Sequence, residues 1–482
     1  MRHALPLFTL ALLGACTVGP DYKGPPAVAS DAVTRGTFVR AADPALTSAP
    51  GLARWWETLN DPTLNALVDD ALAHSPTIDA AQANLRAAQE QYRQQRAARL
   101  PSVSASAVYL NARLPGTNLG GGQQGGGNSD TTLDFYNLGA MASWEPDLFG
   151  GGRRTLEQQR ATEGQRFAQL ADAQVTLSAQ VAQAYVALRD VQARARLNAQ
   201  SSALQRRQLA LVEQRYAAGT ASQLQVERLR NQLNSTDAQT IPLAAQIDEY
   251  KGQLAVLTGR APGALDATLA TVIAVPLPPA QVPIGDPAAL IQHRPDIRAA
   301  ERALAAGNAQ IGVATARKFP SLNLLGIIGL GGTGVSDVLD PSKLATVAAP
   351  MLNWSFLDFG RNRAAVRQAE AQRDAADAQY RQAVLEALQD AETSLSRFGN
   401  ARQQLAQLLL AEQSATRAAT LNAQRVDAGT STLVDQLDIE RQRLSATIGA
   451  EQGRAQLTNN YIAVQKSLGL GWTDPAAASA RP

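Results

Sequence analysis

The chain has 482 residues, a formal net charge of +2 from 44 basic and 42 acidic residues, and only three histidines and one cysteine. Charges of both signs are interspersed, so no global field indicates nucleic acid, and no His/Cys cluster has metal-ligand spacing. No nucleophile–base pair or cofactor loop stands out, so we expect no enzyme activity and no catalytic, cofactor-binding or metal site.

A targeting segment begins the chain. A basic start precedes an apolar run over residues 4–13, which has the length of a signal-peptide core and is too short to span a bilayer. Two small residues and Cys16 follow and resemble a bacterial lipobox, so we expect a signal peptide over 1–15 and acylation at Cys16. Thr17, in place of Asp, indicates passage to the outer membrane. A plain signal peptide that happens to end in cysteine is the alternative.

Residues 16–53 contain several prolines and glycines and predict an extended, acylated arm that lies on a larger body. Trp55 and Trp56 then precede an amphipathic helix. The tryptophan pair could bind a ligand, but such a pair more often packs the start of a helix. A second helix has Pro76 at its first position and ends at Pro101.

After the second helix, apolar residues alternate with small or polar ones. Residues 102–112 and 131–144 predict two strands, joined by a Gly-, Gln- and Asn-rich loop over 115–130. A hairpin over 102–144 with a long loop and aromatic residues fits an outer-membrane strand pair. The glycine-rich loop lacks the Lys-Ser/Thr of a phosphate loop and opens no helix, so it predicts no nucleotide site.

Two proline-free runs, 155–217 and 361–427, predict long helices of roughly 90 Å each. Apolar residues recur every seven positions in two interleaved rows of each run, which indicates a coiled-coil seam rather than a broader stripe. The rows contain Leu170, Leu177, Ala184 and Val191 with Phe167, Val181 and Leu188, and then Val384, Ala391, Phe398 and Leu405 with Leu388, Leu395 and Leu409.

The order helix, strand pair, long helix, turn and return helix occurs twice. Three stretches match their counterparts: 76–103 with 295–322, 144–153 with 354–363, and 215–220 with 425–430. A period of about 210 to 220 residues indicates one duplicated unit rather than a solenoid. The remaining predicted parts are a first repeat over 54–258 with a return helix over 222–257, a Pro-rich equatorial linker over 259–287, a second repeat over 288–470 with a hairpin over 321–357 and a return helix over 432–468, and a tail over 471–482.

The strands require partner chains. One chain supplies four strands, whereas transmembrane barrels of fewer than about eight strands are not found. An open sheet edge in lipid is prohibitive, and the sequence contains no apolar run long enough for a transmembrane helix. Two chains would give eight strands and a filled interior, while three would give twelve and room for a lumen. The sequence therefore predicts a barrel shared between chains.

Together these motifs resemble an outer-membrane efflux factor of the TolC/OprM type, in the lipoprotein branch called NodT. The resemblance covers residues 16–472 and rests on the lipobox, the WW…DPTL entry, both Pro-Ser strand entries, both W…FG junctions, the RPDI…AE stretch at 294–301 and the duplication. It implies a mainly α fold with β: a homotrimer whose 12-stranded transmembrane β-barrel, four strands per chain, continues into a 12-helix periplasmic α-barrel with a mixed equatorial domain.

The same resemblance implies a passive, gated duct that exports small molecules such as drugs or toxic compounds. Its partners would be a periplasmic adaptor, an inner-membrane transporter of the resistance–nodulation–division type and outer-membrane lipid, with no cofactor. A channel for protein or peptide secretion shares the fold and is the alternative function. A soluble coiled-coil scaffold would explain the long helices but neither the lipobox nor the strands.

The resemblance places the periplasmic gate where each long helix turns into its return helix, at Gly219 and at Gly429. Glycine is the usual helix stop, and each turn is followed by a capping pattern, Ser222…Gln225 and Thr432…Asp435. Asp435 and Asp438 match family aspartates that ring the narrowest part of the lumen, where repulsion among carboxylates would raise their pKa values. The alternative is that Asp435 only caps a helix and Asp438 is solvated. The turn residues expected to dock the adaptor are Gly219, Thr220, Gly429 and Thr430.

Three positions depart from the best-known family pattern. Val426 stands in place of a tip tyrosine, Ser431 in place of a tip arginine, and Gln225 in place of an aspartate. The tyrosine and arginine that lock the periplasmic tip in that pattern therefore cannot be assumed here. The residues that we expect as substitutes are Arg215, Tyr216 and Arg425.

Overall fold

A computed structural model describes residues 17–114 and 131–473. The expected signal peptide over 1–15, the acylated Cys16 and the loop over 115–130 lie outside these residues, as does most of the expected tail. The chain forms two compact units: one contains Met1–Pro26, Arg86–Gln165 and Glu301–Gln379, and the other contains Ala27–Leu85, Arg166–Ala300 and Tyr380–Pro482. Each unit thus takes segments from both repeats. None of the described helices combines the length and apolar character needed to cross a lipid bilayer.

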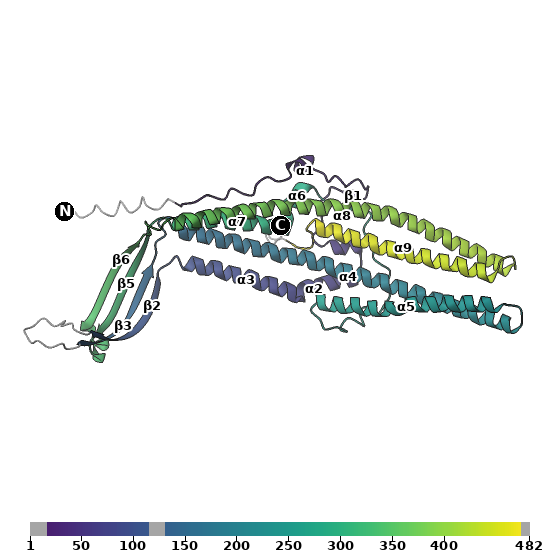
Figure 1. Cartoon of the computed structure of the whole chain (residues 1–482), viewed down its shortest axis with the longest axis horizontal. Coiled ribbons are helices and arrows are strands. Elements are labelled where there is room, and N and C mark those ends of the chain that lie inside the picture. The colour runs from purple at the N-terminus through teal and green to yellow at the C-terminus, as the bar shows by residue number, and fades with distance from the viewer. Residues whose placement is uncertain (1–16, 115–130, 474–482) are drawn as a thin grey trace, which may run out of the picture. The chain divides into compact units, whose positions relative to one another are not determined.

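The first unit contains an antiparallel sheet of four strands, in the order β2-β3-β5-β6 (Figure 1). The two hairpins of the repeats meet through β3 and β5, so the duplicated halves form one sheet. Two short 3-10 helices lie between β5 and β6, within the hairpin that the sequence predicted over 321–357. The bounds are β2 Ser102–Leu114, β3 Thr131–Trp144, β5 Ser321–Gly332, η3 Val335–Leu339, η4 Pro341–Lys343 and β6 Leu344–Asn353.

A tryptophan marks the end of each hairpin. The Trp144 indole N–H donates to the Arg99 carbonyl at 3.0 Å, and that of Trp354 donates to the Lys318 carbonyl at 3.1 Å. Both carbonyls follow the helices that lead into the sheet, α3 (Pro76–Ala97) and α7 (Pro295–Ala316). The two repeats therefore share the same junction contact.

The two long helices are α4 (Gly151–Ala217) and α8 (Arg361–Asp427), each of 67 residues. α4 begins four residues before the predicted start at 155. The Asp147 carboxylate accepts the backbone N–H groups of Gly152 and Arg153 at 3.1 and 2.8 Å, which satisfies donors that the first helical turn leaves free. The capping carboxylate thus lets a glycine run form the first turn.

The second unit holds the main core. The helices α5 (Gln223–Leu257) and α9 (Leu433–Ser467) run back along the ends of α4 and α8 (Figure 1). Trp55 and Trp56 are each 1% exposed and meet edge to face at 5.8 Å, which confirms that the pair packs a helix start. They lie in η2 (Trp55–Leu59), directly before α2 (Pro62–His74).

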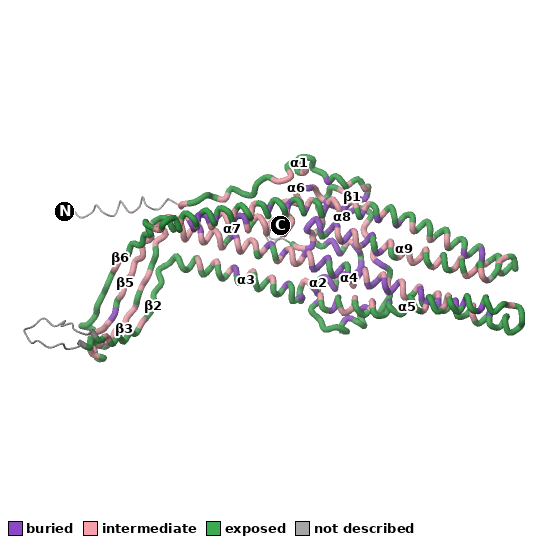
Figure 2. Tube along the Cα trace, in the orientation of Figure 1, coloured by how far each residue is buried: buried purple, intermediate pink, exposed green. Residues whose placement is uncertain are grey.

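Burial along the long helices corrects the coiled-coil interpretation. The predicted rows are mostly buried, and buried residues are concentrated in the middle of α4 (Figure 2). Burial there extends beyond the rows to the polar Ser178, Arg189 and Gln192, although Gln180 and Gln183 are exposed. Leu409, a predicted row member of α8, is 37% exposed. A two-row seam describes a helix covered by one neighbour, whereas α4 is also covered by the short elements and linker of its unit.

The N-terminal arm is not uniformly extended. It contains α1 (Ser30–Arg35) and β1 (Leu46–Thr47), which pairs in parallel with β4 (Val282–Pro283) in the linker; α6 (Pro287–His293) follows that linker strand. The Glu392 carboxylate of α8 accepts the backbone N–H groups of Val39 and Arg40, both at 2.8 Å. Neither the short sheet nor these contacts have a local sequence signal.

Candidate functional site

The two helix turns have the same backbone geometry. Gly219 and Gly429 have φ values of +73° and +70°, the left-handed conformation that favours glycine. The Thr220 N–H donates to the Arg215 carbonyl at 2.8 Å, and the Gly219 N–H donates to the Tyr216 carbonyl at 2.9 Å. The second repeat reproduces both bonds around Gly429. This is the Schellman ending, so the predicted glycine stops are confirmed.

Each return helix begins with a capping box. The Ser222 hydroxyl accepts the Gln225 N–H at 3.3 Å, and the Gln225 side chain accepts the Ser222 N–H at 3.0 Å. Thr432 and Asp435 form the second box. Both predicted capping patterns are confirmed. Gln225, where the family pattern has an aspartate, is a cap.

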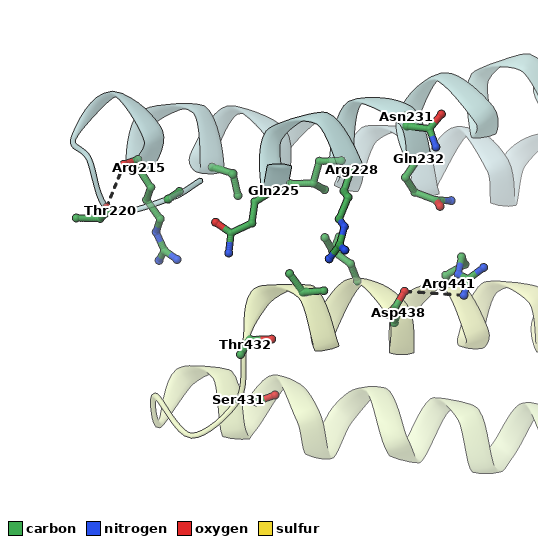
Figure 3. A pocket seen from close by; sticks show the side chains of 15 residues that line it. Arg215, Thr220, Gln225, Arg228, Asn231, Gln232, Ser431, Thr432, Asp438 and Arg441 are labelled. Atoms are coloured by element: carbon green, nitrogen blue, oxygen red, sulfur yellow. Dashed lines mark hydrogen bonds and ion pairs between the residues drawn. The ribbon is translucent and has the colours of Figure 1, made fainter. Parts of the chain in front are cut away.

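In the second unit, α4 and α5 form one helical hairpin and α8 and α9 form another. A groove of about 710 Å³ lies between these two helical hairpins. Its walls carry three arginine side chains, Arg215, Arg228 and Arg441, and one carboxylate, Asp438 (Figure 3). An apolar cluster lies beneath it, formed by Val212, Val226 and Leu229 with the partly buried Leu209, Ala221 and Leu437. Among the described residues, neither Arg215 nor Arg228 has an ion-pair partner.

The return helices line this groove with matched spacing. Each presents residues at i, i+3, i+4 and i+7, the spacing of one helix face. Sequence analysis did not identify Arg228 or Arg441, although this common spacing was the signal that could have found them. α5 contributes Gln225, Arg228, Leu229 and Gln232, and α9 contributes Val434, Leu437, Asp438 and Arg441.

The structure gives the two aspartates different surroundings. Asp435 accepts the Thr432 hydroxyl at 2.7 Å and the Thr432 N–H at 3.3 Å, and does not line the groove. The hydroxyl bond, followed by the backbone bond, lowers the pKa of Asp435. Asp438 does line the groove, and its carboxylate lies 3.8 Å from the Arg441 guanidinium. A pKa raised by repulsion would require carboxylates from other copies of the chain.

The expected tip locks occupy separate places. Arg215 lies in the groove wall, whereas Arg425 donates to the Thr430 carbonyl of its own turn at 3.3 Å. Tyr216 is 48% exposed. Ser431, where the family pattern has arginine, donates its hydroxyl to the Asn422 side chain at 2.8 Å. Within residues 17–114 and 131–473, no group of three or more His, Cys, Asp and Glu side chains is arranged to hold a metal ion.

Known proteins are similar to this chain in sequence and in fold. Residues 67–260 and 287–470 match the family of outer membrane efflux proteins. The chain belongs to this family. It is 29% identical to the solvent efflux pump outer membrane protein SrpC of Pseudomonas putida, over 98% of each chain, and 27% identical to nodulation protein T of Rhizobium leguminosarum bv. trifolii, over 99% of each. The solved structure of the outer-membrane channel OprN superposes with a TM-score of 0.85 at 34% identity, over 95% of this chain and all of that one.

Membership of the outer membrane efflux protein family makes the chain an efflux channel component and not an enzyme, with the mainly helical, partly stranded channel fold. The four-stranded sheet is a second candidate surface. Because paired residues point to the same face, the register places Val103, Leu138, Ile328 and Leu344 together on an apolar face. The opposite face is mixed: it carries serine, asparagine and glycine, including Ser104, Asn137 and Gly329, together with large apolar residues such as Phe135 and Ile327.

Aromatic side chains border the apolar face. Tyr109 and Tyr136 stack at 4.9 Å near the loop end, and Trp144 lies on the same face at the helix end of β3. The eight residue-to-residue steps from Tyr136 to Trp144 span roughly 26 Å. An apolar band of about 25 Å between aromatic girdles is the pattern of an outer-membrane sheet.

Proposed function

We propose that three copies of this chain form the outer-membrane duct of a tripartite efflux pump. The apolar face bordered by Trp144 and the tyrosine pair carries the proposal, because it fits lipid on one side of the sheet. β2 and β6 are the edges of the described sheet, and their unpaired backbone groups need partner strands in lipid. Three four-stranded sheets give twelve strands and a lumen on the more polar face.

The lipobox and the two helix turns, at Gly219 and Gly429, support finer proposals about this duct. Cys16 carries the lipid anchor at the outer membrane. The turns at Gly219–Thr220 and Gly429–Thr430 dock a periplasmic adaptor, which connects the duct to an inner-membrane transporter of the resistance–nodulation–division type. The cargo consists of small molecules, because the relative SrpC is named for solvent efflux. Asp438, with Asp435 beside it, lies at the periplasmic constriction, and Arg215, Tyr216 and Arg425 are the proposed tip locks.

The first experiment is to extract the protein from outer membranes with detergent, determine its mass and record its conductance in planar bilayers. A trimer that conducts ions supports the proposal. A monomer, or a trimer that forms no pore, contradicts it. Deleting the gene should sensitise cells to organic solvents while leaving the set of secreted proteins unchanged, and the reverse result would favour a secretion channel.

A further inference from the structure

Arg154, in the first turn of α4, binds the N-terminal arm. Only 4% of its side chain is exposed. Its guanidinium donates to the Val18 carbonyl at 3.1 Å, the Gly19 carbonyl at 3.1 Å and the Asp21 carboxylate at 2.6 Å. A further bond reaches Glu157 at 2.8 Å. Burying a guanidinium is costly unless its donors are satisfied, and here three of the four bonds go to the arm.

α7, from the other repeat, forms the second wall of this site. The Asn308 amide donates to the Pro20 carbonyl at 2.9 Å, and the Tyr22 hydroxyl donates to the Glu301 carboxylate at 2.8 Å. With the two Arg154 bonds, three successive arm carbonyls, those of residues 18–20, accept hydrogen bonds from side chains of α4 and α7.

Two glycines allow the arm to approach this closely. Gly19 has a φ of +89°, and a Cβ atom there would lie 2.5 Å from the Gly312 Cα atom of α7. A Cβ atom on Gly312 would lie 2.6 Å from the Arg154 Cγ atom. Any side chain at position 19 would therefore displace the arm from α7. The site selects glycine at this position, unlike a surface on which a polar arm merely rests.

We propose that the surface formed by Arg154, Asn308, Gly312 and Glu301 is a binding site for the chain's own residues 17–22. The arm is then a tethered ligand that straps α4 of the first repeat to α7 of the second, beside the junctions between sheet and helices. Val18 extends the strap to the first junction, since its N–H donates to the Phe149 carbonyl at 3.1 Å. The site fixes position 17 and does not depend on acylation of Cys16 or on trimer formation.

Lys23 provides the test, because it is exposed and directly follows the strap. The full-length protein, purified in detergent, is digested briefly with trypsin, and release of the N-terminal peptide that ends at Lys23 is followed by mass spectrometry. We expect Gly19→Ala and Arg154→Met to accelerate release by about tenfold, equivalent to about 1.4 kcal/mol of strap binding.

Gly36→Ala is the matched control. Gly36 also lies on the arm with a positive φ, +70°, but a Cβ atom there would meet nothing within 4 Å. Release in this variant should equal that of the wild type. Gly19→Ala alters no residue of α4 or α7, so its effect cannot come from misfolding of those helices. Equal release from the wild type, Gly19→Ala and Arg154→Met would overturn the strap.

Discussion

Arg228 of α5 and Asp438 of α9 occupy equivalent positions in the two repeats and line the same groove with opposite charges (Figure 3). Each stands thirteen residues after the arginine of its matched turn segment, Arg215 or Arg425. The duplication thus places one cation and one anion where identical repeats would have placed two like charges. An attraction across the groove would favour the approach of the two hairpins.

These opposite charges predict coupled gate variants. Asp438→Ala and Arg228→Ala should each raise the conductance of the proposed channel in planar bilayers, by at most about fivefold, because two charges that attract across the groove without forming an ion pair contribute no more than the about 1 kcal/mol of an exposed salt bridge. The double variant should conduct little more than either single one. Asp427→Ala, at the exposed end of α8, is the control and should conduct like the wild type. Conductance that is unchanged in both single variants would remove the pair from the gate.

Thr432 and Asp435 form the capping box of α9, so changes there should affect the stability of the helix start. Thr432→Ala should weaken the start of α9 by about 1 kcal/mol, seen as faster amide hydrogen exchange in its first turn. Ser222→Ala is the matched change in the first repeat and should affect α5 in the same way. Because hydrogen bonding lowers the pKa of Asp435, its contribution is present above the unfolded-state pKa and is lost as the pH falls through the folded-state value. Protection of these amides, relative to their intrinsic exchange rates, should stay constant as the pH falls from 8 to 5. A loss of protection over that range would contradict this assignment.

A buried bond between distant segments predicts a loss of stability. The Tyr185 hydroxyl donates to the Asp61 carboxylate at 2.7 Å, and both residues are buried. Tyr185→Phe leaves that carboxylate oxygen without its donor and should lower the free energy of unfolding by about 1–3 kcal/mol. Tyr216→Phe, at an exposed site, should leave thermal unfolding unchanged. Equal melting temperatures for the two variants would show that the bond contributes nothing.

Tyr185 also makes the stability of the fold depend on pH in the alkaline range. Burial, and then the bond to Asp61, raise the pKa of Tyr185 above its ordinary value of 10.0. A raised folded-state pKa contributes stability that is fully present below the unfolded-state pKa and is lost as the pH rises through the folded-state value. Wild-type stability should therefore fall faster above pH 10 than that of Tyr185→Phe, as followed by thermal unfolding at stepped pH. Parallel curves for the two proteins would contradict it.

Local chemistry explains which parts of the fold were predictable. The turns and caps depend on hydrogen bonds between residues fewer than six positions apart, so the local sequence specifies them directly. These residues are Gly219, Gly429, Ser222 and Thr432. The strand pairs follow from alternation, and the duplication from matched spacing. The bond between Asp61 and Tyr185 joins residues 124 positions apart, and no periodicity records such a contact.

The candidate site divides in the same way. The turn glycines were predicted from their conformational freedom, whereas Arg228 appeared only when α5 and α9 were seen to face one groove. Arg154 was missed because its partners, Val18 to Asp21, lie in an arm that has no periodic pattern. A heptad pattern also could not show that burial in the middle of α4 extends beyond the two predicted rows, since burial depends on elements that pack from elsewhere in the chain.

Asp172 of α4 predicts a stabilising substitution with a defined pH dependence. Burial, and then the nearby Asp296, raise the pKa of its carboxyl, against the opposing effects of Arg294 and Lys466. Its ionised form is therefore disfavoured in the folded chain, and the stability that it contributes below the unfolded-state pKa is lost as the pH rises through the folded-state value. Asp172→Asn removes this loss. The variant should melt at about the wild-type temperature near pH 4 and above it at pH 7.5.

Thermal unfolding of the detergent-solubilised protein across this pH range measures the effect of Asp172→Asn. Asp248→Asn is the matched control, because Asp248 is exposed in α5, and its melting temperature should follow that of the wild type at every pH. A gain for Asp172→Asn that is constant with pH would point to altered packing rather than to the charge. A loss at pH 7.5 would mean that the attraction of Arg294 and Lys466 outweighs the cost of burying the carboxylate.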